Sequence, residues 1–213
     1  GSIGSDIEQM FVDNPDLERF IPMGAGSVTD AYLSYTLALG AMMAAGFAIA
    51  SVLHLRTEES AGRSELVLAH PVSRTGWSGD HLAVALGGVV VALLASGLGT
   101  GVGIAVALGD AGQVVRMVTA SLALVPVELV LIGVTMLCVG VVPRLAPVAW
   151  AGLAVVVLIG LFADLLRLPG WFRWLSPLEH LPQMPAEAFD APAFAVVTLV
   201  GAGLTVLGLV GFS

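Results

Sequence analysis

Five long apolar runs alternate with polar segments along this chain. The runs cover residues 31–55, 82–108, 114–142, 146–163 and 192–212, and the first two contain no Asp, Glu, Lys or Arg. An α-helix rises about 1.5 Å per residue, so about 20 apolar residues cross the ~30 Å hydrocarbon core of a bilayer. The pattern therefore predicts an all-α integral membrane protein with about five transmembrane helices, forming a single transmembrane domain over residues 1–213.

Two of the polar segments are long enough to carry structure of their own. Within residues 1–30, apolar residues recur at helical spacing on both sides of a break in residues 6–20, which predicts two short amphipathic helices. Residues 164–191 are too short and too charged to span a bilayer. They predict an interfacial or re-entrant helix pair, with Trp171 and Trp174 at the depth of the lipid headgroups.

The polar loop of residues 56–80 is the most charged part of the chain between two spans. Residues 58–69 are rich in Glu, Arg, Leu and Ala, which favour helix, and Glu59 stands four residues before Arg63, the favourable order for an ion pair. Pro71 disfavours helix in the residue before it and predicts the end of this helix. From the residues alone, the loop is either a solvated connector on the headgroups or a surface that a partner binds.

The loop also carries a motif, EE-x2-GR-x-EL-x-LA-x-PVSR, over residues 58–74. A second motif, SPL-x-H-x-P, follows at residues 176–182, before the last predicted span. Together they resemble ABC exporter permeases of the type 2 class, and most closely the actinobacterial permeases known as exporters of polyketide antibiotics of the tetronasin type. The exclusive use of Arg for all eight basic residues suits a GC-rich genome of that kind.

The resemblance implies that residues 56–80 hold a cytoplasmic coupling helix that docks on a separate ATPase subunit. The coupling residues implied are Glu58, Glu59, Gly62, Arg63, Glu65, Leu66, Pro71 and Arg74. ATP and Mg would then bind in the partner ATPase, which works as a dimer, and this chain would bind no cofactor. The exported compound would be lipophilic or amphipathic, such as an antibiotic, and the location would be the plasma membrane.

The resemblance also implies that part of a permease lies outside this sequence. In that family a half-permease has six spans, and the coupling helix joins the second span to the third. The first span of the half is then missing, and the chain is most of the second half of a longer, duplicated permease. Its remaining partner would be the first half or a second permease copy, in addition to the lipid bilayer.

Orientation does not follow from charge alone. Four arginines fall on each side of the predicted spans: Arg56, Arg63, Arg74 and Arg144 on one side, and Arg19, Arg116, Arg167 and Arg173 on the other. Since basic residues favour the cytoplasmic side, this tie leaves the orientation open. The coupling-helix resemblance places residues 56–80 in the cytoplasm and residues 1–30 and 164–191 outside.

Composition excludes several other classes of protein. Hydrophobic residues make up 57% and charged residues 11% of the chain, whereas ordinary globular domains have about 25% charged residues. The formal net charge of −8 argues against a nucleic-acid partner, because such binding needs a basic surface. The one cysteine, Cys138, excludes a disulfide or a thiolate metal cluster within the chain.

Glu128 is the most unusual residue within the predicted spans, because it lies about halfway along the third one, two residues after Pro126. An ionisable group at that depth is costly and faces the bundle interior or a water-filled cavity by default. A helix break at Pro126 would leave a carbonyl free for a hydrogen bond. Two interpretations stay open for Glu128: a polar contact in the substrate route or between permease halves, and a structural acid paired with an Arg or hydroxyl on another helix.

Four glycines in the second span, Gly97, Gly99, Gly101 and Gly103, form two overlapping GxxxG patterns that are typical of close helix packing. A phosphate-binding Walker A loop is excluded because it needs a Lys, which this chain lacks. No GxSxG nucleophile motif is present, and the four histidines do not pair at metal-ligand spacing. We therefore expect a transport subunit and not an enzyme. The alternative is a non-transporting membrane anchor or sensor whose cytoplasmic loop binds a partner.

Overall fold

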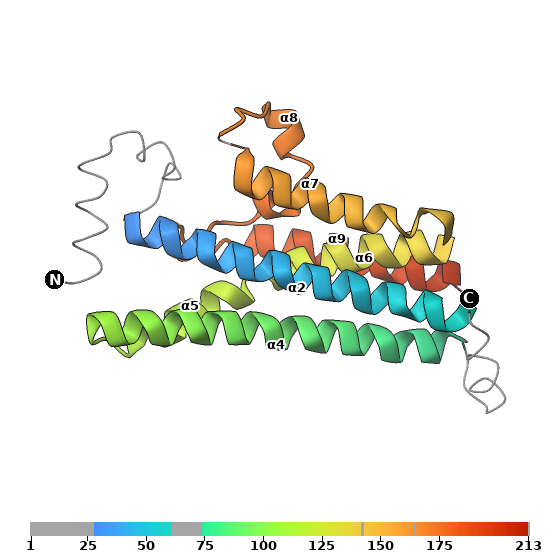
Figure 1. The fold of residues 1–213 in the computed structure, drawn as a ribbon, viewed down its shortest axis with the longest axis horizontal. Helices are drawn as coiled ribbons and strands as arrows, with labels where there is room; N and C mark the ends of the chain where they lie inside the picture. The colour runs from blue at the N-terminus through green and yellow to red at the C-terminus, as the bar shows by residue number, and fades with distance from the viewer. Residues whose placement is uncertain (1–27, 61–73, 142, 164, 213) are drawn as a thin grey trace.

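The computed structural model describes residues 28–60, 74–141, 143–163 and 165–212, and every regular element in those ranges is helical (Figure 1). The elements are α2 (Val28–Ser60), α4 (Arg74–Leu108), α5 (Gly112–Leu122), α6 (Val125–Val141), η2 (Pro143–Leu145), α7 (Val148–Phe162), α8 (Gly170–Arg173), η3 (Pro177–His180) and α9 (Ala191–Phe212). The predicted all-α fold is confirmed. The amphipathic helices predicted for residues 1–27 lie outside the described residues.

Four helical segments of the described chain are long and apolar enough to cross a bilayer: Thr29–His54, Gly79–Leu108, Gly112–Val141 and Ala191–Gly211. The other predicted span forms α7, which has only 15 residues. At about 1.5 Å per residue α7 covers roughly 22 Å, less than the ~30 Å of a hydrocarbon core. Figure 1 agrees, since α7 stops short of the end of the bundle at which α2 begins.

The third predicted span is two helices, and its break lies earlier than the sequence predicted. α5 ends at Leu122 and α6 begins at Val125, whereas we expected the break at Pro126 and Glu128. Pro126 instead occupies the first turn of α6, where a missing N–H costs no hydrogen bond and the fixed φ of proline suits a helix start. The backbone N–H of Val127 then donates to the Leu124 carbonyl at 3.0 Å.

α2 lies at the centre of the bundle, packed against α4, α6 and α7 (Figure 1). The largest core cluster joins three of these helices through mostly small or β-branched side chains: Ala41, Ala44, Ala48, Val52, Ala85, Val89, Leu93, Ile132, Met136 and Val139. A row of alanines on α2 lets neighbouring helix backbones approach closely, as small residues do in membrane bundles. A movement of α2 would therefore displace side chains of both α4 and α6.

α6 and α9 form the closest helix pair of the bundle. A Cβ atom added to Gly201 would lie 2.8 Å from the backbone of Leu129, and one added to Gly208 would lie 2.5 Å from the backbone of Met136. The contact nearer the C-terminus of α9 is also nearer the C-terminus of α6, so the two helices run parallel. Residues between these helices must therefore return to the end where α6 begins, and residues 163–190 complete that return.

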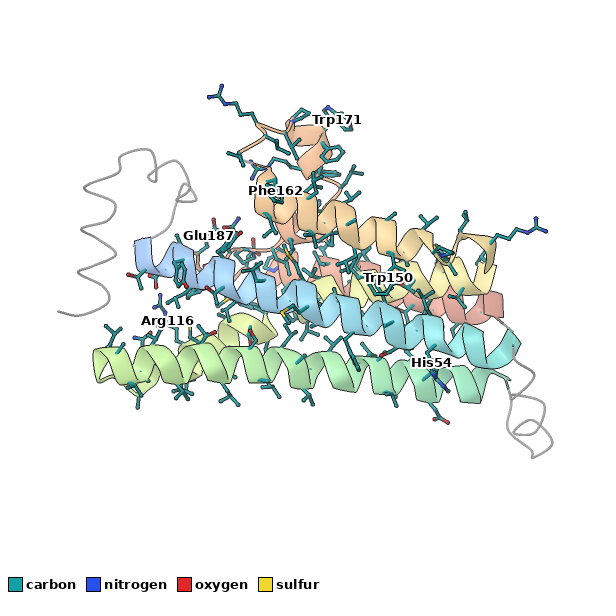
Figure 2. The ribbon with its side chains drawn as sticks, viewed as in Figure 1. His54, Arg116, Trp150, Phe162, Trp171 and Glu187 are labelled. Atoms are coloured by element: carbon teal, nitrogen blue, oxygen red, sulfur yellow. The ribbon has the colours of Figure 1, made fainter. Side chains whose placement is uncertain are left out.

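That returning segment contains two short helical elements, α8 and η3, within residues 164–191, for which the sequence predicted an interfacial or re-entrant helix pair. Figure 2 shows Trp171 on a lobe that projects from the side of the bundle. Trp171 and Trp174 are 72% and 76% exposed. Exposed tryptophans on such a lobe suit the headgroup region of a membrane.

Candidate functional site

The predicted coupling segment joins the ends of two neighbouring helices. α2 continues as helix to Ser60, so Glu58 and Glu59 extend its last turn, and Arg74 is the first residue of α4. The other predicted coupling residues lie outside the described residues: Gly62, Arg63, Glu65, Leu66 and Pro71. The segment of residues 61–73 is therefore anchored at both ends on helices that share one core.

Glu128 lies in the first turn of α6 and is only 1% exposed. Neither carboxylate oxygen has a hydrogen-bond partner in the part of the chain that the structure describes. The interpretation of Glu128 as an acid paired with an Arg or hydroxyl of another helix is therefore wrong for these residues. Its neighbours Val127 and Ile132 belong to two core clusters that both include α2. Burying an ionised carboxylate without compensation costs several kcal/mol, so an acid at this position is unfavourable for the stability of the fold.

The four glycines of the second span fall on two different faces of α4. A Cβ atom on Gly97 would lie 2.9 Å from Cα of Val118, and one on Gly101 would lie 2.8 Å from Cα of Val114, so both glycines pack against the backbone of α5. No atom of the described chain lies within 4 Å of a Cβ built on Gly99 or Gly103. The first GxxxG pair therefore holds α5 against α4, and the second faces away from the described helices.

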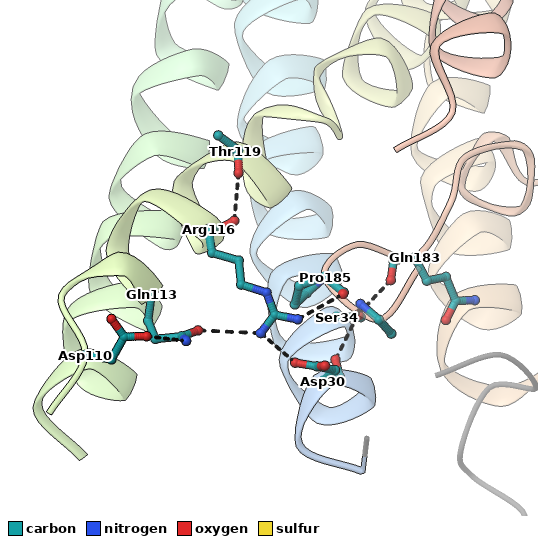
Figure 3. A network of polar contacts seen from close by, with 9 residues as sticks. Asp30, Ser34, Asp110, Gln113, Arg116, Thr119, Gln183 and Pro185 are labelled. Atoms are coloured by element: carbon teal, nitrogen blue, oxygen red, sulfur yellow. Dashed lines mark hydrogen bonds and ion pairs between the residues drawn. The ribbon is translucent and has the colours of Figure 1, made fainter. Parts of the chain in front are cut away.

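At the end of the bundle where α2 begins, polar groups from three segments meet (Figure 3). The guanidinium of Arg116 on α5 lies 2.8 Å from the carboxylate of Asp30, in the first turn of α2. It also donates to the backbone carbonyl of Pro185 at 3.2 Å and to the side-chain oxygen of Gln113 at 3.5 Å. We call Asp30, Ser34, Gln113, Arg116 and the backbone they bind at residues 183–186 the Arg116 cluster.

Ser34 is the buried member of the Arg116 cluster. Its hydroxyl lies 2.9 Å from the carbonyl oxygens of Asp30 and Gln183, and it accepts a hydrogen bond from the N–H of Ala186 at 3.2 Å. The hydroxyl has one hydrogen, which serves one of the two carbonyls at a time. The Arg116 cluster therefore ties the segment before α9 to both α2 and α5.

Two further interactions order turns of the chain. The side-chain amide of Gln113 and the N–H of Gly112 donate to the carboxylate of Asp110, and both hydrogen bonds lower the pKa of that exposed carboxyl. On the projecting lobe, Arg173 pairs with Glu179 at 3.1 Å. Both interactions are local, and they fix the turn before α5 and the turn between α8 and η3.

Sequence reasoning missed the Arg116 cluster because its hydrogen bonds join residues up to 152 positions apart along the chain. The signal that was available is the opposite charge of Asp30 and Arg116 at the ends of two spans placed on the same side.

The residues that the structure describes contain no group of three or more His, Cys, Asp or Glu side chains arranged to hold a metal ion.

A family model described as the C-terminal domain of the multidrug efflux system permease Rv1217c matches residues 1–213. The multidrug efflux system permease protein Rv1217c of Mycobacterium tuberculosis (strain ATCC 25618 / H37Rv) is 33% identical over 215 residues, which include 100% of this chain and 39% of that relative. This chain is thus similar to a C-terminal part of an efflux permease, as the motifs at residues 58–74 and 176–182 predicted.

Proposed function

This chain belongs to the family of the C-terminal domain of the multidrug efflux permease Rv1217c, and from that premise we propose that it forms part of the permease subunit of an ATP-driven ABC exporter. The complete permease would move lipophilic or amphipathic, drug-like compounds outward across the plasma membrane. A separate ATPase, working as a dimer, would bind ATP and Mg and supply the energy. The chain itself would be a transport subunit and not an enzyme.

The observation that carries this proposal is the placement of the coupling segment between α2 and α4. α2 runs to Ser60 and α4 starts at Arg74, so a partner that pulls on residues 61–73 acts on both helices at once. Both helices contribute to the core cluster that also includes α6. Because close-packed cores transmit displacements and do not absorb them, a movement at the loop would reach the centre of the bundle.

The exposed face of α2 supports a lipophilic cargo. Large apolar side chains recur on it every three to four residues, which places them on one face of the helix: Tyr32, Tyr35, Leu39 and Met43. This face is free of described chain between α4 and α7 in Figure 1. Such a surface would contact lipid, substrate or the rest of the permease, and it offers few hydrogen-bonding groups to a sugar or a free ion. No observation favours the alternative of a non-transporting anchor or sensor.

The proposal is tested by reversing charges in the coupling segment of the complete permease. Changing Glu59 and Glu65 to Arg together should abolish copurification of the ATPase, because charges that are paired and buried at an interface cost about 2–5 kcal/mol when lost. Membrane insertion should be unchanged. Ala188→Arg, at an exposed position before α9, is the control and should keep the complex intact.

Transport supplies the second measurement. Inverted membrane vesicles that contain the permease and its ATPase should take up a lipophilic dye when ATP is added, and the double reversal should stop this uptake. An ATPase whose Walker A Lys is replaced should give the same loss with the unchanged permease. Full complex formation and full uptake by the double reversal would rule out docking at this loop.

A further inference from the structure

A cavity opens between α2 and α4 at the end of the bundle where residues 61–73 join them. It has a volume of about 570 Å³ and is lined by Phe47, Ala50, Ser51, His54, Asp80, His81 and Val84. Figure 2 shows His54 at this end, beside α4. On the proposed orientation, the cavity lies at the cytoplasmic boundary of the membrane. No residue of the Arg116 cluster is among the described residues that line it.

The lining changes from apolar to polar along the helix axes. Phe47 and His54 are seven residues apart on α2, which is about 10 Å along a helix. α4 runs in the opposite direction, so Val84 is deeper in the bundle than Asp80 and His81. The cavity therefore has an apolar inner part and a polar mouth, which matches the shape of an amphipathic molecule at a membrane surface.

Phe47 closes the deep part of the cavity because glycine leaves room for its ring on α4. A Cβ atom built on Gly88 would collide with the ring atoms of Phe47. The ring thus packs on the bare backbone of α4 while the side chain stays 47% exposed. An exposed aromatic ring offers both apolar area and a negative π-face to a ligand.

Asp80 gives the mouth of the cavity its charge. With histidine counted as neutral at pH 7, Asp80 is the one formally charged residue among the described residues of the lining. Its exposed carboxylate makes no hydrogen bond or ion pair with any residue that the structure describes. A carboxylate beside an apolar space and an aromatic ring favours a cation that carries an apolar body.

We propose that this cavity binds amphipathic organic cations at the membrane boundary, with Asp80 holding the positive group and Phe47, Ala50 and Val84 contacting the apolar body. The proposal deepens the proposed function, on which its role in transport rests, by naming a substrate class and its first binding site. Two sources share this chemistry: a free drug-like cation and the ammonium headgroup of phosphatidylethanolamine in the same leaflet. Binding itself requires neither ATP nor the ATPase.

The test is equilibrium binding to the complete permease, purified without its ATPase and reconstituted in nanodiscs of phosphatidylglycerol. The probes are tetraphenylphosphonium and tetraphenylborate, which have nearly the same shape and opposite charge. Asp80→Asn should weaken tetraphenylphosphonium binding about three- to fivefold, the range for an exposed ion pair, and should leave tetraphenylborate binding equal or stronger. Asp110→Asn, which removes an exposed acid at the other end of α4, should change neither.

A second variant tests the site independently of charge. Val84→Trp places a large side chain into the cavity from an exposed position, and it should weaken binding of both probes at least as much as Asp80→Asn weakens the cation. Adding phosphatidylethanolamine to the nanodiscs separates the two sources. Weaker tetraphenylphosphonium binding identifies the lipid headgroup as a competitor for the cavity, and unchanged binding identifies a site for free cations.

Unchanged binding of the cation to both Asp80→Asn and Val84→Trp would overturn the proposal, as would an equal loss of both probes in Asp80→Asn. Because the ATPase is absent, these results do not depend on the coupling segment. A permease that binds the cation normally but fails to copurify with an ATPase would refute the proposed function and leave this site standing.

Discussion

The guanidinium of Arg116 lies 2.8 Å from the carboxylate of Asp30 and so joins α5 to the first turn of α2. This contact matters because α5 is separated from α6 by a break at residues 123 and 124. A second anchor is the hydroxyl of Ser121, which donates to the carbonyl of Leu93 on α4 at 2.8 Å. α5 is therefore held by its neighbours and not by continuity with α6.

The ion pair should contribute modestly and measurably to stability. Arg116→Gln and Asp30→Asn should each lower the unfolding temperature of the complete permease, and a double-mutant cycle should give a coupling of about 0.5–1 kcal/mol. The value is discounted for solvent screening because the Arg116 side chain is 40% exposed. The coupling should shrink in high salt. Arg144→Gln, an exposed arginine at the other end of the bundle, should have no effect. A coupling of zero at low salt would show that the Arg116 cluster is held by its neutral hydrogen bonds alone.

The two glycine pairs of α4 should respond oppositely to alanine. Gly97→Ala should destabilise the permease by about 1–3 kcal/mol, because the new Cβ would lie within 3.0 Å of the backbone of α5. Gly99→Ala should stabilise the permease by about 0.5–1 kcal/mol, since alanine favours helix and no described atom lies near it. Thermal unfolding monitored by circular dichroism measures both. If Gly99→Ala proves as damaging as Gly97→Ala, a part of the permease outside the described chain packs on that face.

Glu128 should oppose stability and support activity. Glu128→Met should stabilise the permease by roughly 1–3 kcal/mol, because it removes a buried carboxylate with no partner among the described residues. Glu128→Gln should have a smaller effect, since it keeps a polar group in the same place. Comparison of unfolding temperatures with ATP-driven uptake separates the two properties. Stabilisation of Glu128→Met together with lost uptake marks a residue retained for transport, whereas lower stability of Glu128→Met would indicate a partner outside the described residues.

Topology is tested by thiol labelling in a Cys138→Ala background. Single cysteines at Ala111 and Ala188 should react with a membrane-impermeant reagent on intact cells, because both positions are exposed at the end of the bundle proposed to be external. A cysteine at Leu145, exposed at the other end, should react only after the membrane is opened. The reverse pattern would invert the orientation and would place residues 61–73 outside, where no ATPase could bind them.

Much of the fold follows from the sequence because the length and apolarity of a run are local properties. The runs that became α2, α4, α9 and the α5–α6 pair were each visible without knowledge of their neighbours. The interruption of the third span was also visible, although its position was not, because proline is tolerated in a first helical turn as well as beyond a last one. The family resemblance was readable for the same reason, since residues 58–74 and 176–182 are short contiguous motifs.

The sequence did not predict in this way which helix each residue contacts. Gly97 and Gly99 have the same residue type and the same spacing pattern, yet only Gly97 meets α5. The depth of Glu128 predicted its burial, but its lack of a hydrogen-bond partner among the described residues depends on the tertiary packing around it. His54 and His81 do not pair at metal-ligand spacing in the sequence, and only the antiparallel packing of α2 and α4 brings them to one cavity with Asp80.

By itself, the sequence determined that this protein is a bundle of membrane-spanning helices from an efflux-permease family, because hydrophobic length and local motifs need no knowledge of the rest of the chain. Only the tertiary structure decided which face of each helix is covered, where α5 is anchored and where a cavity remains. The physical reason is that a helix presents several faces of similar apolarity, and the choice among them is made by close contacts between residues far apart in the chain.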